Sequence, residues 1–158
     1  MNYCGLDLSL SGTGLIILDS TGQILLQQLI KTKASQVMEE RFDNILYEID
    51  DKVVSKFKTN EYIINMEGLS FGSSGQSMLE LAGLHYIIRH FFYIHKVNYI
   101  VTPPTKVKKF VTGKGNCKKN LMLLNVYKKF GITFDDDNIA DAYCLAQLNL
   151  HDNWIPKS

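Results

Sequence analysis

Residues 2–31, NYCGLDLSLSGTGLIILDSTGQILLQQLIK, decide the fold class of this chain. Three apolar runs, at residues 2–9, 13–19 and 23–31, have the length and composition of β-strands. Residues 20–22 (Ser-Thr-Gly) between the second and third runs are typical of a hairpin turn. The opening segment therefore predicts three consecutive strands.

The rest of the chain alternates helical and strand patterns. In order, it predicts a helix at 36–57, a strand at 61–66, a helix at about 77–95, a strand at 98–102, lysine-rich helical stretches divided by residues 113–116, and a final helix that opens at the aspartates 135–137 and runs to about residue 150. Three strands followed by β–α alternation predict an α/β fold with a mixed five-stranded sheet flanked by helices. No linker or repeat interrupts the sequence, so we expect residues 1–158 to form one domain.

Composition excludes several classes of protein. No apolar run approaches the roughly 20 residues that a membrane span needs, and the N-terminus lacks the basic lead of a signal peptide. Cys4, Cys117 and Cys144 form no CxxC pair, which favours reduced thiols in a cytoplasmic protein. The four histidines form no HxxxH or HxH pair, so we interpret them as ordinary surface or half-buried residues.

Charge is distributed unevenly along the chain, although the net charge is only +1. Residues 81–134 contain ten basic residues and no acid, whereas the remainder holds all sixteen acids against seven basic residues. Such segregation opposes folding through self-repulsion unless it serves a purpose. The segment is either a solvated lysine-rich face or a surface that binds phosphates, where each lysine releases counterions from a nucleic acid.

Three carboxylates stand in apolar surroundings. Asp7 lies in a strand between two leucines, Glu67 ends the run YIINM, and Asp141 lies in a helix that is apolar almost all round. No lysine or arginine occurs within five residues of any of them. Hard divalent ions such as Mg²⁺ bind oxygen ligands, and two ions about 4 Å apart serve phosphodiester cleavage. We predict a metal site; the alternatives are a strand-end acid bonded to the backbone for Asp7 and a solvent-facing position for Asp141.

The aspartates at 135–137 allow a simpler explanation, because acids in the first turn of a helix cap free amides and suit its dipole. We interpret two of the three in this way. Asp137 lies four residues before Asp141, so both project from one helical face. Asn138, three residues before Asp141, shares that face approximately.

Four segments together resemble the RuvC-type Holliday junction resolvases of the ribonuclease-H-like superfamily. They are GLDLSLSGTG (5–14), INMEG (64–68), TPPTKVKKFVTGKGNCKKNLM (102–122) and NIADAYCLA (138–146). Each motif alone is weak, but the ordered set covers nearly the whole chain. The Lys-, Asn- and Ile-rich composition looks like a bacteriophage-encoded version from a low-GC host, such as a lactococcal phage.

The resemblance implies a homodimer that nicks opposing strands of a four-way DNA junction with two Mg²⁺ ions, or Mn²⁺, leaving 5′-phosphates. It places metal ligands at Asp7, Glu67 and Asp141. Many members carry a further acid three residues before the last one; here that residue is Asn138, so either Asn138 or Asp137 would be the fourth ligand. Lys119 would stabilise charge at the cleaved phosphate. The DNA contacts that it implies are Phe71, Lys106, Lys108, Lys109, Lys114, Lys118 and Lys119.

The sequence also allows other interpretations of the structure and function. The apolar helix at 77–95 suits either a dimer interface or a core position. The chain is alternatively a non-catalytic branched-DNA-binding or packaging protein, an actin or sugar-kinase relative, or another nuclease such as a ribonuclease H or terminase. Replication forks and flaps are further candidate substrates.

Overall fold

The computed structural model describes residues 1–69, 75–116 and 120–152. Its centre is one five-stranded sheet with the strand order β3-β2-β1-β4-β5. The strands are β1 (Asn2–Asp7), β2 (Gly12–Leu18), β3 (Ile24–Lys31), β4 (Tyr62–Glu67) and β5 (Tyr99–Thr102). The pairs β1–β2 and β2–β3 are antiparallel, whereas β1–β4 and β4–β5 are parallel. The predicted mixed α/β sheet is confirmed.

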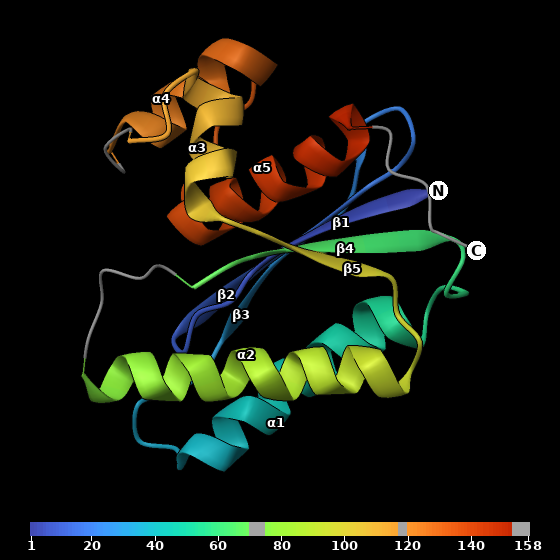
Figure 1. The fold of residues 1–158 in the computed structure, drawn as a ribbon, viewed down its shortest axis with the longest axis vertical. Coiled ribbons are helices and arrows are strands. Elements are labelled where there is room, and N and C mark those ends of the chain that lie inside the picture. Colours follow the sequence, from blue (N-terminus) through green and yellow to red (C-terminus); the bar gives the residue numbers. More distant parts are fainter. Residues whose placement is uncertain (70–74, 117–119, 153–158) are drawn as a thin grey trace.

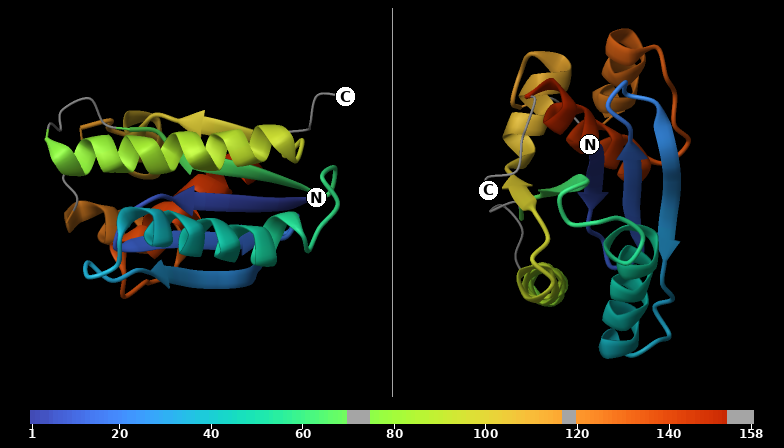
Figure 2. Two further views of the ribbon diagram at one scale, coloured as in Figure 1. Left: turned by 90° about the horizontal axis from the view of Figure 1, so that it is seen from below. Right: turned by 90° about the vertical axis from the view of Figure 1, so that its right-hand side faces the viewer.

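Helices cover both faces of the sheet (Figure 1). One face carries α1 (Met38–Ile49) and α2 (Gln76–Ile94), which lie side by side in Figure 2. The other face carries α3 (Pro104–Thr112), α4 (Asn120–Phe130) and α5 (Asp137–His151). Within the described residues, no helix combines the length and apolarity needed to cross a membrane.

Alternation of side chains along the strands divides the core into two layers. Tyr3 and Ile63 are buried against α5 and its neighbours, whereas Leu6 and Ile64 are buried against α1 and α2. Successive side chains of a strand point to opposite faces. Asp7 lies four residues after Tyr3, and Glu67 lies four residues after Ile63. Both carboxylates therefore point to the face of the sheet that α5 covers.

The turn between β2 and β3 forms as predicted. The side chain of Asp19 accepts hydrogen bonds from the backbone N–H groups of Thr21 and Gln23, at 2.8 and 2.9 Å. Gly22 has φ +87°, which is a conformation that glycine adopts without steric cost. These contacts fix the hairpin that brings β3 into antiparallel register with β2.

Several predicted boundaries differ from the structure by one or two residues, and two further differences change the description of an element. The first strand ends at Asp7 and not at residue 9, so Asp7 lies at a strand end. The helix predicted at 36–57 ends as an α-helix at Ile49 and continues as a π-helical turn, Asp50–Val54. Val53 in this turn is fully buried, so the apolar spacing that predicted one long helix continues through it.

Candidate metal and nucleic-acid site

Asp7 and Glu67 end neighbouring parallel strands. In the β1–β4 pairing, Leu6 lies beside Met66, so the next residue of each strand emerges at the same edge of the sheet. Both carboxylates line a cavity of about 90 Å³, whose walls also include His85 of α2 and Pro104 at the start of α3. The carboxyl ends of parallel strands are the usual place for ligand binding in α/β folds.

The start of α5 is held against this edge by close main-chain contacts. Gly14 lies opposite Asp7 in the β1–β2 pairing. A β-carbon at Gly14 would lie 2.1 Å from the carbonyl oxygen of Asn138, and one at Gly5 would lie 1.8 Å from that of Ala142. Only glycine permits such an approach. The start of α5 lies near the C-terminal ends of β1 and β4 (Figure 1, left side). The half-buried Asp141 directly precedes Ala142, so these contacts bring it toward the strand ends.

The pKa of the Cys144 thiol indicates where two of the carboxylates lie. Burial raises the pKa of Cys144, and the negative charges of Asp141 and Glu67 raise it further. Coulomb interactions weaken with distance, so both carboxylates lie in the neighbourhood of this thiol. Asp141 and Glu67, far apart in sequence, therefore approach the same region of α5.

A buried polar connection supports the strand ends. The hydroxyl of Thr102 on β5 donates to Oδ1 of Asn65 on β4 at 2.7 Å, and Nδ2 of Asn65 donates to the carbonyl of Leu145 on α5 at 3.1 Å. Sequence analysis missed this connection. The only available signal was the polar Asn65 inside the apolar run YIINM.

The aspartates before α5 differ in role. Asp136 is the N-cap, because its carboxylate accepts from the N–H groups of Asn138 and Ile139 at 2.9 and 3.3 Å. This agrees with the capping prediction. Asp137 and Asn138 are half-buried. The side-chain nitrogen of Asn138 lies 3.4 Å from the position of a β-carbon on Gly12, so this amide faces β2.

The predicted metal ligands are engaged with other groups of the protein. Asp7, Glu67, Asp137 and Asp141 each make an interaction. In the part of the chain that the structure describes, no three acidic, histidine or cysteine side chains form a group that could by itself hold a metal ion. What the fold supplies is the approach of oxygen donors from β1, β4 and α5 to one edge of the sheet.

The turn after Asp7 is fixed by side chains that sequence analysis did not single out. Arg41 of α1 and the hydroxyl of Thr32 both donate to the carbonyl of Leu10, and Arg41 Nε donates to Thr32 Oγ1 at 2.9 Å. The hydroxyl of Thr13 donates to the carbonyl of Ser9 at 2.9 Å. These bonds hold the chain where it leaves β1.

The predicted DNA-contacting lysines that the structure describes lie on α3 and just after it. Lys106, Lys109 and Lys114 are exposed, and Lys108 is half-buried. Lys106 also forms an ion pair with Asp152 at 3.1 Å, which is a surface contact of small energy. Phe71, Lys118 and Lys119 lie outside the described residues.

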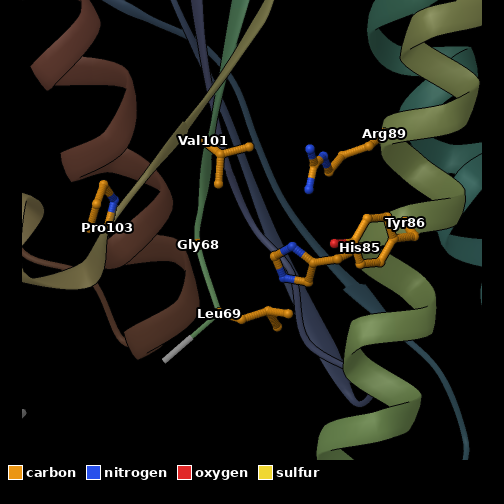
Figure 3. Close-up of a pocket in the computed structure, with 7 residues that line it drawn as sticks. All are labelled: Gly68, Leu69, His85, Tyr86, Arg89, Val101 and Pro103. Atoms are coloured by element: carbon orange, nitrogen blue, oxygen red, sulfur yellow. The ribbon is translucent and has the colours of Figure 1, made fainter. Parts of the chain in front are cut away.

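A larger cavity adjoins the acidic one (Figure 3). It has a volume of about 310 Å³ and shares Gly68, Leu69 and His85 with the smaller cavity; its other lining residues are Tyr86, Arg89, Val101 and Pro103. Burial, and then the charge of Arg89, lower the pKa of His85 to about 4, so its ring is neutral at pH 7. His90 and His95 are exposed, as expected of ordinary histidines, but His85 is buried between the two cavities.

Comparison with known proteins places these features in a family. The family model described as crossover junction endodeoxyribonuclease RuvC matches residues 3–148. A curated RuvC of Brachyspira hyodysenteriae is 26% identical over 137 residues, covering 87% of this chain and 84% of that protein.

Solved structures share the fold. Thermus thermophilus RuvC has a TM-score of 0.78 at 17% identity, with 97% of this chain and 96% of that chain covered. The fowlpox virus resolvase, solved with Holliday junction DNA, has a TM-score of 0.60 at 19% identity, with 97% and 99% covered. RuvC-family nucleases are metal-dependent. The match over nearly the whole chain, together with the fold, shows that this chain belongs to the RuvC family of crossover junction endodeoxyribonucleases.

Proposed function

We propose that this protein resolves four-way DNA junctions by paired, Mg²⁺-dependent nicks that leave 5′-phosphate ends. The observation that carries the proposal is the meeting of Asp7, Glu67 and the start of α5 at one edge of the sheet. Family membership supports the reaction class. Thermus thermophilus RuvC and the fowlpox virus resolvase were both solved in complex with Holliday junctions, which supports the substrate.

The residues at this edge suit a hard divalent cation, because their donors are carboxylate oxygens. Asp7, Glu67 and Asp141 would hold Mg²⁺, or Mn²⁺ in its place, with Asp137 or the amide oxygen of Asn138 as a fourth ligand. When bound, a pair of such ions activates water and stabilises the departing 3′-oxygen. The protein positions the donors: Arg41 fixes the turn after Asp7, and Asn65 ties β4 to α5.

The lysine-rich segment would hold the DNA backbone. Residues 81–134 carry ten positive charges without an acid, and the exposed lysines of α3 follow directly from the cavity wall at Pro104. Each phosphate contact releases counterions, so we expect binding to weaken steeply with salt. Lys118 and Lys119 would extend this surface, with Lys119 at the cleaved phosphate, and Phe71 would stack on an unpaired base.

A second copy of the chain would cover the outer face of α2. Leu79, Tyr86 and Tyr93 recur every seven residues and are 69%, 64% and 69% exposed, and Ile87 and Ile94 lie beside them. Residues seven apart lie on one side of a helix. A stripe of large exposed apolar side chains marks an interaction surface. In the homodimer, two-fold symmetry would present two sites to opposite strands of a junction.

The remaining parts of the proposal concern biological setting. The composition favours a bacteriophage-encoded protein that acts as one domain in the host-cell cytoplasm. Forks and flaps are included as substrates, because they present bends similar to those of a four-way junction.

The test compares a synthetic four-way junction with a linear duplex of matching sequence, each with Mg²⁺ or with EDTA, on native and denaturing gels. Paired symmetric nicks near the branch point, only with Mg²⁺ and only in the junction, are the expected result. Tight junction binding without nicks would favour a non-catalytic branched-DNA-binding protein. Equal cutting of the linear duplex would favour a different nuclease of the same fold.

A further inference from the structure

We infer that the cavity lined by His85 and Arg89 binds one unpaired nucleotide of the DNA strand that the site cleaves. The inference rests on the proposed function, since it takes the substrate to be branched DNA. It assigns a base-binding role to α2 residues that lie outside the carboxylate group and outside the lysine-rich helices.

The position of the cavity is the first argument. It shares Gly68, Leu69 and His85 with the cavity that contains Asp7 and Glu67. Gly68 directly follows Glu67, so the two cavities meet where β4 ends. A strand whose phosphodiester lies at the carboxylates has its neighbouring nucleotide within reach of this second cavity.

Arg89 brings a buried donor to this cavity. Its Nε is buried and has no hydrogen-bond partner among the described residues, while the rest of its guanidinium donates to the side chains of Tyr99 and Tyr86. Its guanidinium carbon lies 5.0 Å from the centre of the Tyr86 ring. This ring lines the cavity and is also 64% exposed, so its outer side stays available to the α2 stripe proposed above as the dimer interface. Figure 3 shows the guanidinium extending from α2 toward Val101 of β5. A guanidinium plane stacks on nucleobases and donates to their acceptors.

His85 adds a second group that suits a base. Because its ring is neutral at pH 7, it carries one donor and one acceptor, and in Figure 3 it projects from α2 into the cavity beside Leu69 and Gly68. Leu69, Val101 and Pro103 form apolar walls. A phosphate alone would gain nothing from those walls, whereas a flat base with polar edges uses both kinds of contact.

The size of the cavity limits the occupant. A volume of about 310 Å³ is near the lower end of the range of roughly 300–1,000 Å³ for small-molecule sites. One nucleotide matches this size and a duplex does not. Extruding a base from a stack costs least where pairing is already interrupted, as at a branch point. The cavity therefore favours branched DNA over an intact duplex.

The test measures junction binding in EDTA, where the result does not depend on metal. A series of four-way junctions carries a single abasic residue at successive positions near the crossover, and dissociation constants come from fluorescence anisotropy. At one position the abasic residue should weaken binding by the wild-type protein about tenfold. An abasic residue at that same DNA position should change the dissociation constant of the Arg89→Met variant less than twofold, because this variant has already lost the contact with the base.

Lys58→Met is the control: it removes an exposed positive charge in the loop before β4, outside the lysine-rich segment, and should keep the wild-type pattern. Circular dichroism shows whether Arg89→Met is folded. If it is not, His85→Gln serves as the cavity variant. An identical abasic pattern in the wild-type protein and the folded cavity variant would overturn the inference. So would a neutral methylphosphonate linkage that weakens binding by the wild-type protein but not by Arg89→Met, with no abasic position that distinguishes the two proteins, because Arg89 would then bind a phosphate. Failure of the proposed function appears separately, as a lack of Mg²⁺-dependent nicks by the wild-type protein.

Discussion

Gly14 of β2 and Asn138 of α5 meet through their main chains, at a distance that leaves no room for a side chain on Gly14. A β-carbon there would lie 2.1 Å from the Asn138 carbonyl oxygen, so Gly14→Ala must push α5 away from the sheet. Overpacking of this kind costs about 1–3 kcal/mol or more of unfolding free energy. Urea denaturation measures the loss, and junction nicking should fall with it because Asp141 moves with α5.

Gly83→Ala is the control for that variant. A β-carbon at Gly83 of α2 would lie 3.6 Å from the Phe42 ring, an ordinary contact, and alanine is favoured over glycine inside a helix by about 1 kcal/mol. We expect unchanged or raised stability and unchanged nicking. If Gly14→Ala and Gly83→Ala gave the same stability and the same nicking rate, the close main-chain packing of α5 against Gly14 would be contradicted.

Thr102→Val should destabilise the protein by about 1–3 kcal/mol, because Oδ1 of the buried Asn65 loses its donor while the shape of the side chain is kept. Chemical denaturation gives the value. Thr133→Val, at an exposed position, should stay within about 0.5 kcal/mol of the wild type. Equal effects of the two substitutions would contradict the role given to the Thr102–Asn65 hydrogen bond.

Asp7→Asn should lower the nicking rate on the order of a thousandfold, because loss of a charged ligand removes several kcal/mol of transition-state stabilisation. Junction affinity in EDTA should not fall, since the substitution removes no phosphate contact. Asp135→Asn, at an exposed acid beside the N-cap, should nick at nearly the wild-type rate. Retained nicking by Asp7→Asn would remove the basis for the metal site.

The fourth ligand is distinguished by comparing Asp137→Ala with Asn138→Ala. The substitution that removes a ligand should raise the Mg²⁺ concentration needed for half-maximal nicking. We expect the larger rise for the residue that coordinates, with the other close to the wild type. If neither substitution changes the Mg²⁺ dependence, the site uses only the three carboxylates at positions 7, 67 and 141.

Tyr93→Glu should convert a dimer into monomers, because it places a charge in the stripe of exposed apolar residues on α2. Analytical ultracentrifugation measures the mass. Leu25→Glu is the control, because Leu25 is a large apolar residue of β3 that is 51% exposed and lies away from α2. A wild-type monomer at micromolar concentration, or an intact dimer in Tyr93→Glu, would contradict the proposed interface.

His85 should make stability depend on pH. The pKa of its ring is lowered to about 4 in the folded protein, against an ordinary value of 6.5. The unfolded chain therefore takes up the proton first as pH falls, and stability decreases between pH 6.5 and pH 4. The loss from pH 7.5 to 4.5 should be roughly 2–3 kcal/mol. This component should vanish in His85→Gln and persist in His90→Gln, whose histidine is exposed in the wild type; equal slopes in both variants would refute it.

The order of strands and helices followed from the sequence because each element carries a clear apolar period. Asp7 and Glu67 were found because a carboxylate next to buried strand residues is unusual, and the structure places both at one cavity. Their coordination of metal stays a prediction. The close packing of α5 on β1 and β2 could not be predicted from the sequence. Nothing local distinguishes Gly5 and Gly14 from the other glycines of the chain.

The cavity lined by His85 and Arg89 could not be predicted from the sequence either. His85 and Arg89 lie in a helix whose apolar pattern is equally typical of a core helix, and nothing local shows that they border β4 and β5. The same holds for Arg41, which bonds to the Leu10 carbonyl from a distant helix. Contacts between side chains and distant main-chain atoms depend on tertiary structure and leave no periodic trace.

The seating of α5 on glycines has a consequence for how such a chain can diverge. Where two backbones touch, the position of the helix depends on the absence of side chains at Gly5 and Gly14 more than on the identity of the residues packed around them. The surrounding apolar residues are then free to exchange for others of similar bulk without moving the acidic edge of the sheet. A fold kept at a TM-score of 0.78 with only 17% identity to Thermus thermophilus RuvC is the pattern that this tolerance predicts.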